Sequence, residues 1–97
     1  MTSKQRAYLK SLASKENVLF NIGKSSITPE VTQAIAEALD ARELIKIGVL
    51  KNCMDDPREI ADMVAGRTKS MVVQVIGKKI VLYKESKDHK KIMLPLE

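Results

Sequence analysis

Aromatic residues are almost absent from this chain of 97 residues, which contains one Phe, two Tyr and no Trp. A packed interior must therefore be built from aliphatic side chains, and a hydrophobic content of 44% is enough for one compact domain. Recognition of nucleic-acid bases by rows of stacked aromatic rings is disfavoured, because that binding mode needs several exposed rings.

Cysteine and histidine are equally scarce. The single cysteine, Cys53, excludes an internal disulfide and a cysteine-based zinc cluster. The single histidine, His89, lies in a lysine-rich stretch, where a solvated basic segment explains it better than catalysis. The Asp55-Asp56 pair is explained by helix capping, since a metal site needs more oxygen ligands. We therefore expect no metal, no cofactor and no enzymatic activity.

Long apolar runs are also missing. No stretch reaches the roughly 18–20 apolar residues that span a bilayer. The first six residues, MTSKQR, do not lead into the apolar stretch of a signal peptide. We expect a cytoplasmic protein that does not enter a membrane.

Charge, by contrast, is abundant and unevenly distributed around a net value of +5. Residues 1–27 contain five basic and one acidic side chain, residues 28–66 four basic and eight acidic, and residues 67–97 eight basic and three acidic. Basic ends around an acidic middle predict one surface that faces a polyanion, provided that the fold brings the two ends together. The alternative is a lysine-rich surface that serves only solubility.

Helical spacing and capping residues predict three helices. The first covers Ser3–Ala13, with Ser3 as a possible N-cap. The second begins at Pro29 after Thr28 as N-cap. The third begins at Pro57 after Asp56, and Glu59 is spaced to complete a capping box.

Short runs of β-branched and aliphatic residues predict four strands, at Asn17–Ile22, Glu43–Leu50, Met71–Ile76 and Lys79–Tyr83. Gly77-Lys78 joins the last two as a tight hairpin. The element order α-β-α-β-α-β-β predicts an α/β two-layer sandwich in which helices cover a four-stranded mixed sheet. Residues 1–97 form a single domain in this interpretation, and the segment Ile92–Leu96 either lies against the sheet or stays mobile.

The most specific local feature is the junction IGKSSITPE, residues 22–30, where a strand ends and a capped helix begins. A glycine lets the backbone approach a ligand, and N–H groups near a helix start attract phosphate oxygens. Lys24 adds a charge, and Ser25 and Ser26 add hydroxyl donors. The plainer interpretation is a simple strand-to-helix turn. Neither a Walker A loop nor a dinucleotide-binding fingerprint is present.

In its wider context the chain resembles the YhbY family, whose domain is called CRM, for chloroplast RNA splicing and ribosome maturation. The matching residues keep the family's order and spacing over nearly the whole chain: Lys4-Gln5-Arg6, Leu9-Lys10, Ile22-Gly23-Lys24, Ile27-Thr28, Ile35, Ala38-Leu39, Glu43-Leu44-Ile45-Lys46, Val75-Ile76-Gly77-Lys78 and Val81-Leu82-Tyr83-Lys84.

The resemblance implies a fold like the C-terminal domain of translation initiation factor 3 and a G-x-x-G loop that clamps the RNA backbone as in KH domains. It also implies association with precursors of the large ribosomal subunit for bacterial members, intron splicing for plant relatives, and no enzymatic activity. Ser26 replaces the second loop glycine. If that position needs a positive φ, serine bears a steric cost of about 1 kcal/mol, offset by a reshaped turn or by a hydroxyl contact.

Our leading hypothesis is therefore an RNA-binding module acting on ribosomal RNA in the precursor of the large subunit, with ribosomal proteins as further partners and a monomeric state. Its candidate contacts are Gly23, Lys24, Ser25, Ser26 and Thr28 in the loop, and Lys4, Arg6, Lys10, Lys78 and Lys79 on the basic segments. The alternative is a protein–protein adaptor that docks a ribosomal protein or assembly factor through its acidic second and third helices.

Overall fold

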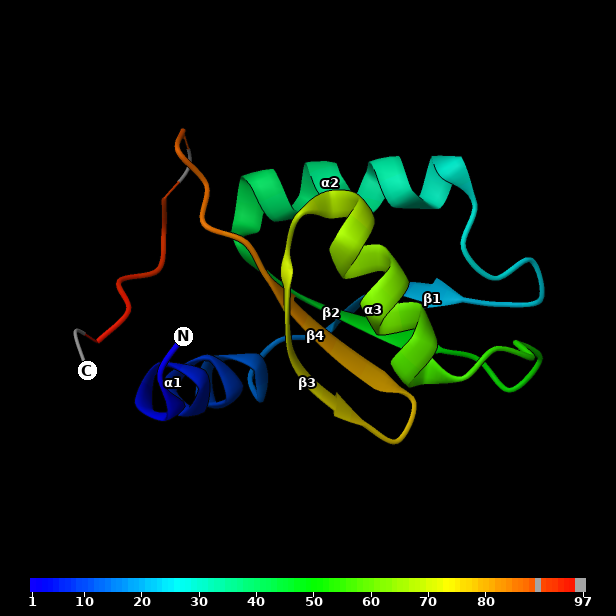
Figure 1. The fold of residues 1–97 in the computed structure, drawn as a ribbon, viewed down its shortest axis with the longest axis horizontal. Helices are drawn as coiled ribbons and strands as arrows, with labels where there is room; N and C mark the ends of the chain where they lie inside the picture. Colours follow the sequence, from blue (N-terminus) through cyan, green and yellow to red (C-terminus); the bar gives the residue numbers. More distant parts are fainter. Residues whose placement is uncertain (89, 96–97) are drawn as a thin grey trace.

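The chain folds into three helices and four strands (Figure 1). This computed structural model describes residues 1–88 and 90–95, so His89, Leu96 and Glu97 lie outside the described residues. The elements follow one another as α1 (Ser3–Ala13), β1 (Val18–Ile22), α2 (Pro29–Arg42), β2 (Leu44–Val49), α3 (Pro57–Thr68), β3 (Met71–Ile76) and β4 (Lys79–Tyr83). The predicted element order and the α/β class are confirmed.

The four strands form one mixed sheet in the order β1-β2-β4-β3. β1 and β2 are parallel because α2 carries the chain back across the sheet between them. β4 is antiparallel to both of its neighbours, and the turn at Gly77-Lys78 inserts it between β2 and β3. Gly77 has φ 55°, the positive value for which a glycine was expected in this turn.

Side-chain caps begin the helices. Thr2, rather than the predicted Ser3, caps α1, and it forms a reciprocal capping box with Gln5. Thr28 Oγ1 accepts the N–H of Val31 at 3.2 Å and caps α2 as predicted. Asp56 caps α3 as predicted by accepting the N–H of Arg58 at 2.9 Å. Glu59 does not complete the predicted box, because within the described chain its side chain returns no hydrogen bond to the cap.

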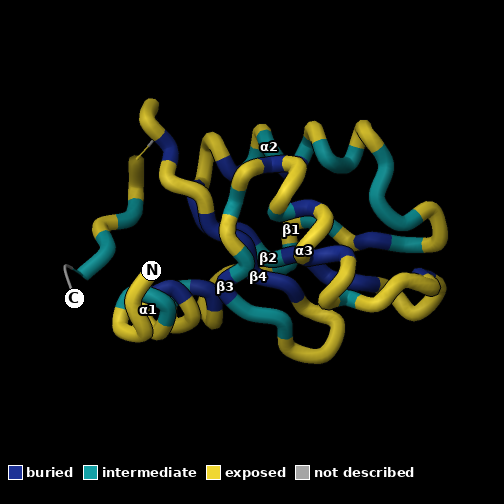
Figure 2. Tube along the Cα trace, viewed as in Figure 1, coloured by how far each residue is buried: buried dark blue, intermediate teal, exposed yellow. Residues whose placement is uncertain are grey.

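The central strands β2 and β4 are mostly buried (Figure 2), and the two faces of the sheet carry clusters of unequal size. Along β4, Ile80 and Leu82 join an aliphatic cluster with α2 and α3, whereas Val81 and Tyr83 join a smaller cluster under α1. Side chains alternate between faces along a strand, so α1 lies on the side opposite α2 and α3. The sheet with α2 and α3 makes the predicted two-layer sandwich, and α1 covers one end of the other face.

The segment after β4 is held by a buried carboxylate. Glu43, between α2 and β2, has φ 67° and no exposed surface. Its carboxylate accepts backbone N–H groups of Ser86 at 2.8 Å, Lys91 at 2.6 Å and Ile92 at 2.8 Å. Ile92 and Leu94 then pack against the cluster under α1. Of the two predicted alternatives for this segment, its described part lies packed on the domain.

Candidate nucleic-acid interface

The predicted loop forms a closed turn between β1 and α2. The N–H of Ser26 donates to the carbonyl of Gly23 at 2.9 Å, so Lys24 and Ser25 are the two central residues of a β-turn. Both central residues are exposed, and Thr28 ends the loop by capping α2. The turn therefore presents a positive charge and a hydroxyl at its tip.

Ser26 adopts φ 54°, in the left-handed region that glycine prefers. Its Oγ donates a hydrogen bond of 2.5 Å to Asp55 Oδ2 in the loop between β2 and α3. The condition for a steric cost at this position is thus met. The hydroxyl contact that accompanies it is made to a carboxylate in another loop, which sequence spacing could not reveal.

The backbone conformation at Gly23, in contrast, does not require a glycine. Its φ is not positive, and an added Cβ would lie 3.5 Å from Asn52 Oδ1 and 3.6 Å from Leu50 Cδ1, which are ordinary contacts. The fold would accommodate alanine here. Any need for glycine at this position must come from something that approaches the backbone from outside.

Three loops meet at one end of the sheet (Figure 1). The N–H of Leu50 donates to the carbonyl of Ile22 at 2.8 Å, and the N–H of Val49 donates to the carbonyl of Lys78 at 2.7 Å. These bonds hold residues 23–28, residues 50–56 and the turn 77–78 together at the same end of the sheet. We call this end the loop end.

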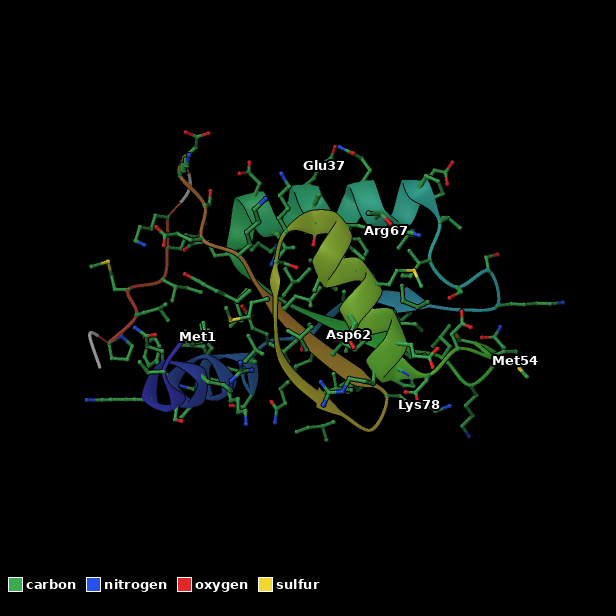
Figure 3. All side chains as sticks on the ribbon, viewed as in Figure 1. Met1, Glu37, Met54, Asp62, Arg67 and Lys78 are labelled. Atoms are coloured by element: carbon green, nitrogen blue, oxygen red, sulfur yellow. The ribbon has the colours of Figure 1, made fainter. Side chains whose placement is uncertain are left out.

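The loop end is rich in unpaired cations, namely Lys24, Lys51, Lys78 and Lys79. All four side chains are exposed, and none forms an ion pair with a carboxylate in the described part of the chain. Figure 3 shows Lys78 and Met54 extending from this end. Lys51 was not among the predicted contacts, although its position directly after a buried strand was a usable signal.

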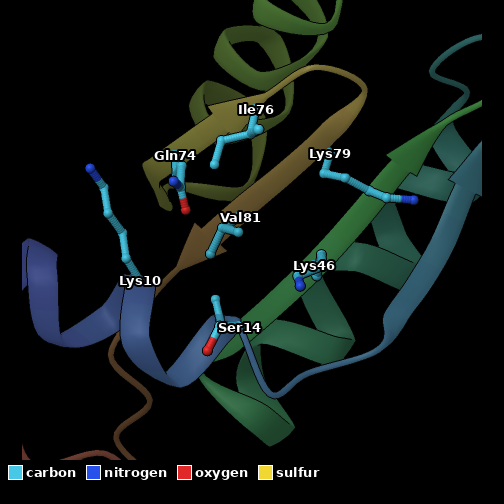
Figure 4. Close-up of a pocket in the computed structure, with 8 residues that line it drawn as sticks. Lys10, Ser14, Lys46, Gln74, Ile76, Lys79 and Val81 are labelled. Atoms are coloured by element: carbon cyan, nitrogen blue, oxygen red, sulfur yellow. The ribbon is translucent and has the colours of Figure 1, made fainter.

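The predicted basic residues of α1 lie elsewhere. Lys4 is exposed, and Lys10 lies on the sheet side of the helix beside β3 (Figure 4). Arg6 Nη1 donates to the carbonyls of Val72 at 2.9 Å and Val73 at 2.7 Å, where the pairing of β3 with β4 is irregular. The structure therefore separates the predicted contacts into a larger group at the loop end and a smaller group on α1.

The basic ends of the sequence do meet in the fold. α1 packs on β3 and β4, so Lys10 from the first basic segment and Lys79 from the second line one groove. Lys46 of β2 lines it too, and it was not among the predicted contacts. A signal was present, because Lys46 is the one charged residue in the otherwise apolar run of the strand Leu44–Val49.

Acidic residues gather on the outer surfaces of α2 and α3. Glu37 extends into solvent from α2 (Figure 3), and the side chains of Glu37 and of Asp62 on α3 are both exposed. Arg42, Arg58 and Arg67 on the same two helices dilute this negative surface.

Two further observations concern only residues 1–88 and 90–95. None of the helices there combines the length and the apolar character that a membrane-spanning helix requires. No group of three or more His, Cys, Asp or Glu side chains there is arranged to hold a metal ion.

Known proteins resemble this chain over almost its whole length. The "Probable RNA-binding protein YqeI" of Bacillus subtilis is 45% identical over 95 residues, which cover 98% of this chain and 99% of that protein. An "RNA-binding protein" of Haemophilus influenzae is 35% identical over 95 residues, covering 98% and 95%. The solution structure of the hypothetical protein SAV1595 from Staphylococcus aureus matches with a TM-score of 0.81 and 46% identity, covering 98% of this chain and 99% of that one.

The family model of the CRS1/YhbY (CRM) domain matches residues 1–84. This match takes in all seven elements and the loop between β1 and α2. The resemblance found in the sequence is thus confirmed, and the chain belongs to the CRS1/YhbY (CRM) domain family.

Proposed function

We propose that this chain is an RNA-binding domain that contacts the phosphate backbone through the turn at residues 23–26. The observation that supports it best is the exposed tip of that turn, where Lys24 and Ser25 stand at an end of the sheet lined with unpaired lysines. Relatives that cover nearly the whole chain are named RNA-binding proteins.

Long-range electrostatic attraction adds to the contacts made by the tip of the turn. Lys51, Lys78 and Lys79 surround the same end and attract a polyanion before any close contact forms. Binding of this kind weakens steeply with salt, because each neutralised phosphate releases counterions. Lys4 and Lys10 add attraction from α1, while Arg6 holds β3 with one of its nitrogens.

In this proposal, Ser26 and Thr28 fix the conformation of the loop. Ser26 donates the N–H that closes the turn and has a positive φ, and its hydroxyl is engaged by Asp55. Thr28 Oγ1 is engaged by the N–H of Val31. Direct phosphate contacts therefore belong to Lys24, Ser25 and the backbone at Gly23.

Ribosomal RNA of a large-subunit precursor is the target we propose. The support is the family resemblance, since members in bacteria are associated with that particle. The scarcity of aromatic rings fits such a target, because recognition through backbone and charge suits folded RNA better than base stacking does.

Fluorescence anisotropy with protein-free fragments of large-subunit ribosomal RNA tests the proposal. Lys24→Ala/Ser25→Ala should weaken binding by about tenfold, the effect of losing one charge-assisted contact. It should also flatten the salt dependence of log K by about 0.7–0.9 for each lost phosphate contact. Ser11→Ala/Lys15→Ala is the matched control, because it removes the same two groups from exposed positions of α1 and the residues just after it.

Circular dichroism confirms that both variants are folded before they are compared. Equal losses in the two variants would refute the turn as the contact site. Absence of salt-dependent binding by the unmodified chain would refute RNA binding itself.

The adaptor hypothesis has one observation in its favour, the exposed acidic residues on α2 and α3. It predicts binding to ribosomal particles without binding to their protein-free RNA. A Glu37→Gln/Asp62→Asn variant that loses particle association while keeping RNA affinity would support the adaptor.

A further inference from the structure

A groove runs between α1 and the part of the sheet that α1 leaves uncovered (Figure 4). Its volume is about 290 Å³, and its lining residues come from α1, the residue after it, and three strands: Lys10, Ala13, Ser14, Lys46, Gln74, Ile76, Lys79 and Val81. The groove is separate from the turn at residues 23–26, and it lies on the face opposite α2 and α3.

The groove exists because α1 covers only one end of the sheet face that lies opposite α2 and α3. At the α1 end, β2 and β4 contribute Leu44 and Tyr83, which are buried under the helix. Two residues away on the same face of each strand, Lys46 and Val81 lie beside the end of α1. The uncovered face is therefore apolar at its floor and cationic at its rim.

The rim charges have one sign. Lys10, Lys46 and Lys79 line the groove from three different elements, and no acidic side chain lines it. None of the three forms an ion pair with a carboxylate within residues 1–88 and 90–95. Three cations around one groove without a counter-charge among the described residues indicate an anionic occupant.

The floor and walls indicate what else the occupant carries. Ile76 is 60% exposed and provides most of the accessible apolar surface, while Ala13 and Val81, 2% and 4% exposed, close the bottom of the groove. The half-buried amide of Gln74 has no hydrogen-bond partner in the described chain, so one donor and one acceptor are available to a polar edge. An apolar ring with a polar edge and an attached phosphate satisfies all three requirements.

We propose that this groove binds one unpaired nucleotide of an RNA, with its base against Val81 and Ile76, its base edge at Gln74 and its phosphate among Lys10, Lys46 and Lys79. The proposal rests on the RNA-binding function argued above and adds a second contact to it. A volume of about 290 Å³ suits a single nucleotide, and a paired helix could not insert its bases here.

The position of the groove suits a strand that also reaches the turn. Lys79 pairs with Gly48, and Gly48 pairs with Asn21, so these three residues form a row across the sheet from the groove to β1. The row is roughly 10 Å long, two strand spacings. Gly48 has no side chain, and the side chain of Asn21 occupies the space above it, since a Cβ there would lie 2.7 Å from Asn21 Oδ1. Asn21 then precedes Gly23 of the turn by two residues.

Binding of labelled single-stranded RNA and of the same RNA annealed to its complement tests the inference. Lys46→Ala/Gln74→Ala removes one cation and one amide from the groove, whereas Gln33→Ala/Lys84→Ala removes the same groups from exposed positions outside it. The groove variant should lose about tenfold more affinity for the single strand than the control does. Both variants should bind the duplex alike.

Chemical-shift mapping of the unmodified chain provides a second test. The two probes are a nucleoside monophosphate and inorganic phosphate. We expect the nucleotide to shift Gln74 and its neighbours on β3 and β4, and phosphate alone to shift them much less. Equal shifts with phosphate would overturn the nucleotide assignment and leave an anion site.

The failure of this inference is distinguishable from the failure of the proposed function. If single-stranded RNA shifts only residues 23–26 and the groove variant behaves like its control, the groove site is refuted and the turn stands. If the RNA shifts neither region, both are refuted.

Discussion

The two ends of the sheet use polar side chains in opposite ways. At the α1 end, Arg6, Gln5 and Glu43 are bonded to backbone groups of the chain itself. At the loop end, Lys24 and Lys78 extend into solvent without an ion-pair partner among the described residues. Arg6 thus maintains the fold at the α1 end, whereas the lysines at the loop end remain available, so the basic residues of a sequence cannot be assigned a role by their charge alone.

The largest effect should come from breaking the internal bonding at the α1 end. Glu43→Gln keeps one acceptor oxygen but turns an NH₂ group toward an N–H of residues 86–92, so at least one buried donor loses its partner. We expect a loss of about 2–3 kcal/mol and a fall in Tm of about 10–15 °C. Glu85→Gln, which removes only an exposed ion pair with Lys90, should change stability by less than about 0.5 kcal/mol. Similar Tm values for the two variants in thermal melts would contradict this role.

The same carboxylate should make stability depend on pH. Burial alone would raise the pKa of Glu43, but three backbone N–H groups and the charge of Lys90 outweigh it and lower the pKa below 4.5. A lowered pKa stabilises the folded chain above the unfolded value, and this contribution is lost as pH falls through the folded value. The gap in Tm between the unmodified chain and Glu43→Gln should therefore be full at pH 7 and shrink below about pH 4.5. A gap that is constant from pH 7 to pH 3 would count against it.

At the loop end, Asp55→Asn should strengthen RNA binding, and this gain should be smaller than the loss of stability in Glu43→Gln. The Asp55 carboxylate lies 2.5 Å from Ser26 Oγ and repels any phosphate that approaches the turn. Its removal should tighten RNA binding by about threefold at low salt, since an exposed charge at 4 Å contributes about 1 kcal/mol or less. Asp62→Asn on α3 makes the same change of charge away from the loop end and should change affinity less. Anisotropy titrations in which the two variants match would show that Asp55 does not face the RNA.

The smallest effect on stability should come from Gly23→Ala. An added Cβ meets Asn52 and Leu50 at ordinary distances, so the free energy of unfolding should change by less than about 0.5 kcal/mol. RNA affinity is the informative measurement. A clear loss of affinity in a variant of unchanged Tm would show that RNA approaches this backbone closely, and unchanged affinity would remove Gly23 from the contact set.

Much of the fold followed from local sequence signals. Thr28-Pro29 and Asp56-Pro57 place the starts of α2 and α3 because a cap and its proline act on adjacent residues. Gly77 likewise identifies the hairpin by its own conformation. These signals need no knowledge of the tertiary structure, which is why most predicted element ends match the observed ones and the others, at β1 and β2, differ by one residue.

The parts that sequence reasoning missed depend on residues far apart in the chain. Glu43 was assigned to the start of a strand, but it caps α2 with a positive φ and bonds to residues more than 40 positions later. The contact of Ser26 with Asp55 spans 29 positions. Arg6 reaches the carbonyl of Val72 across 66 positions. None of these pairings has a spacing rule, so only the assembled fold reveals them.

Glu43 also bears on where the domain ends as a physical unit. The family match stops at residue 84, yet the three N–H groups that satisfy this carboxylate belong to residues 86, 91 and 92. A fragment cut at the family boundary would leave a buried charge with none of these donors and would uncover the cluster beneath Ile92. An expression fragment designed around this domain should therefore extend through the segment that contains Ile92 and Leu94.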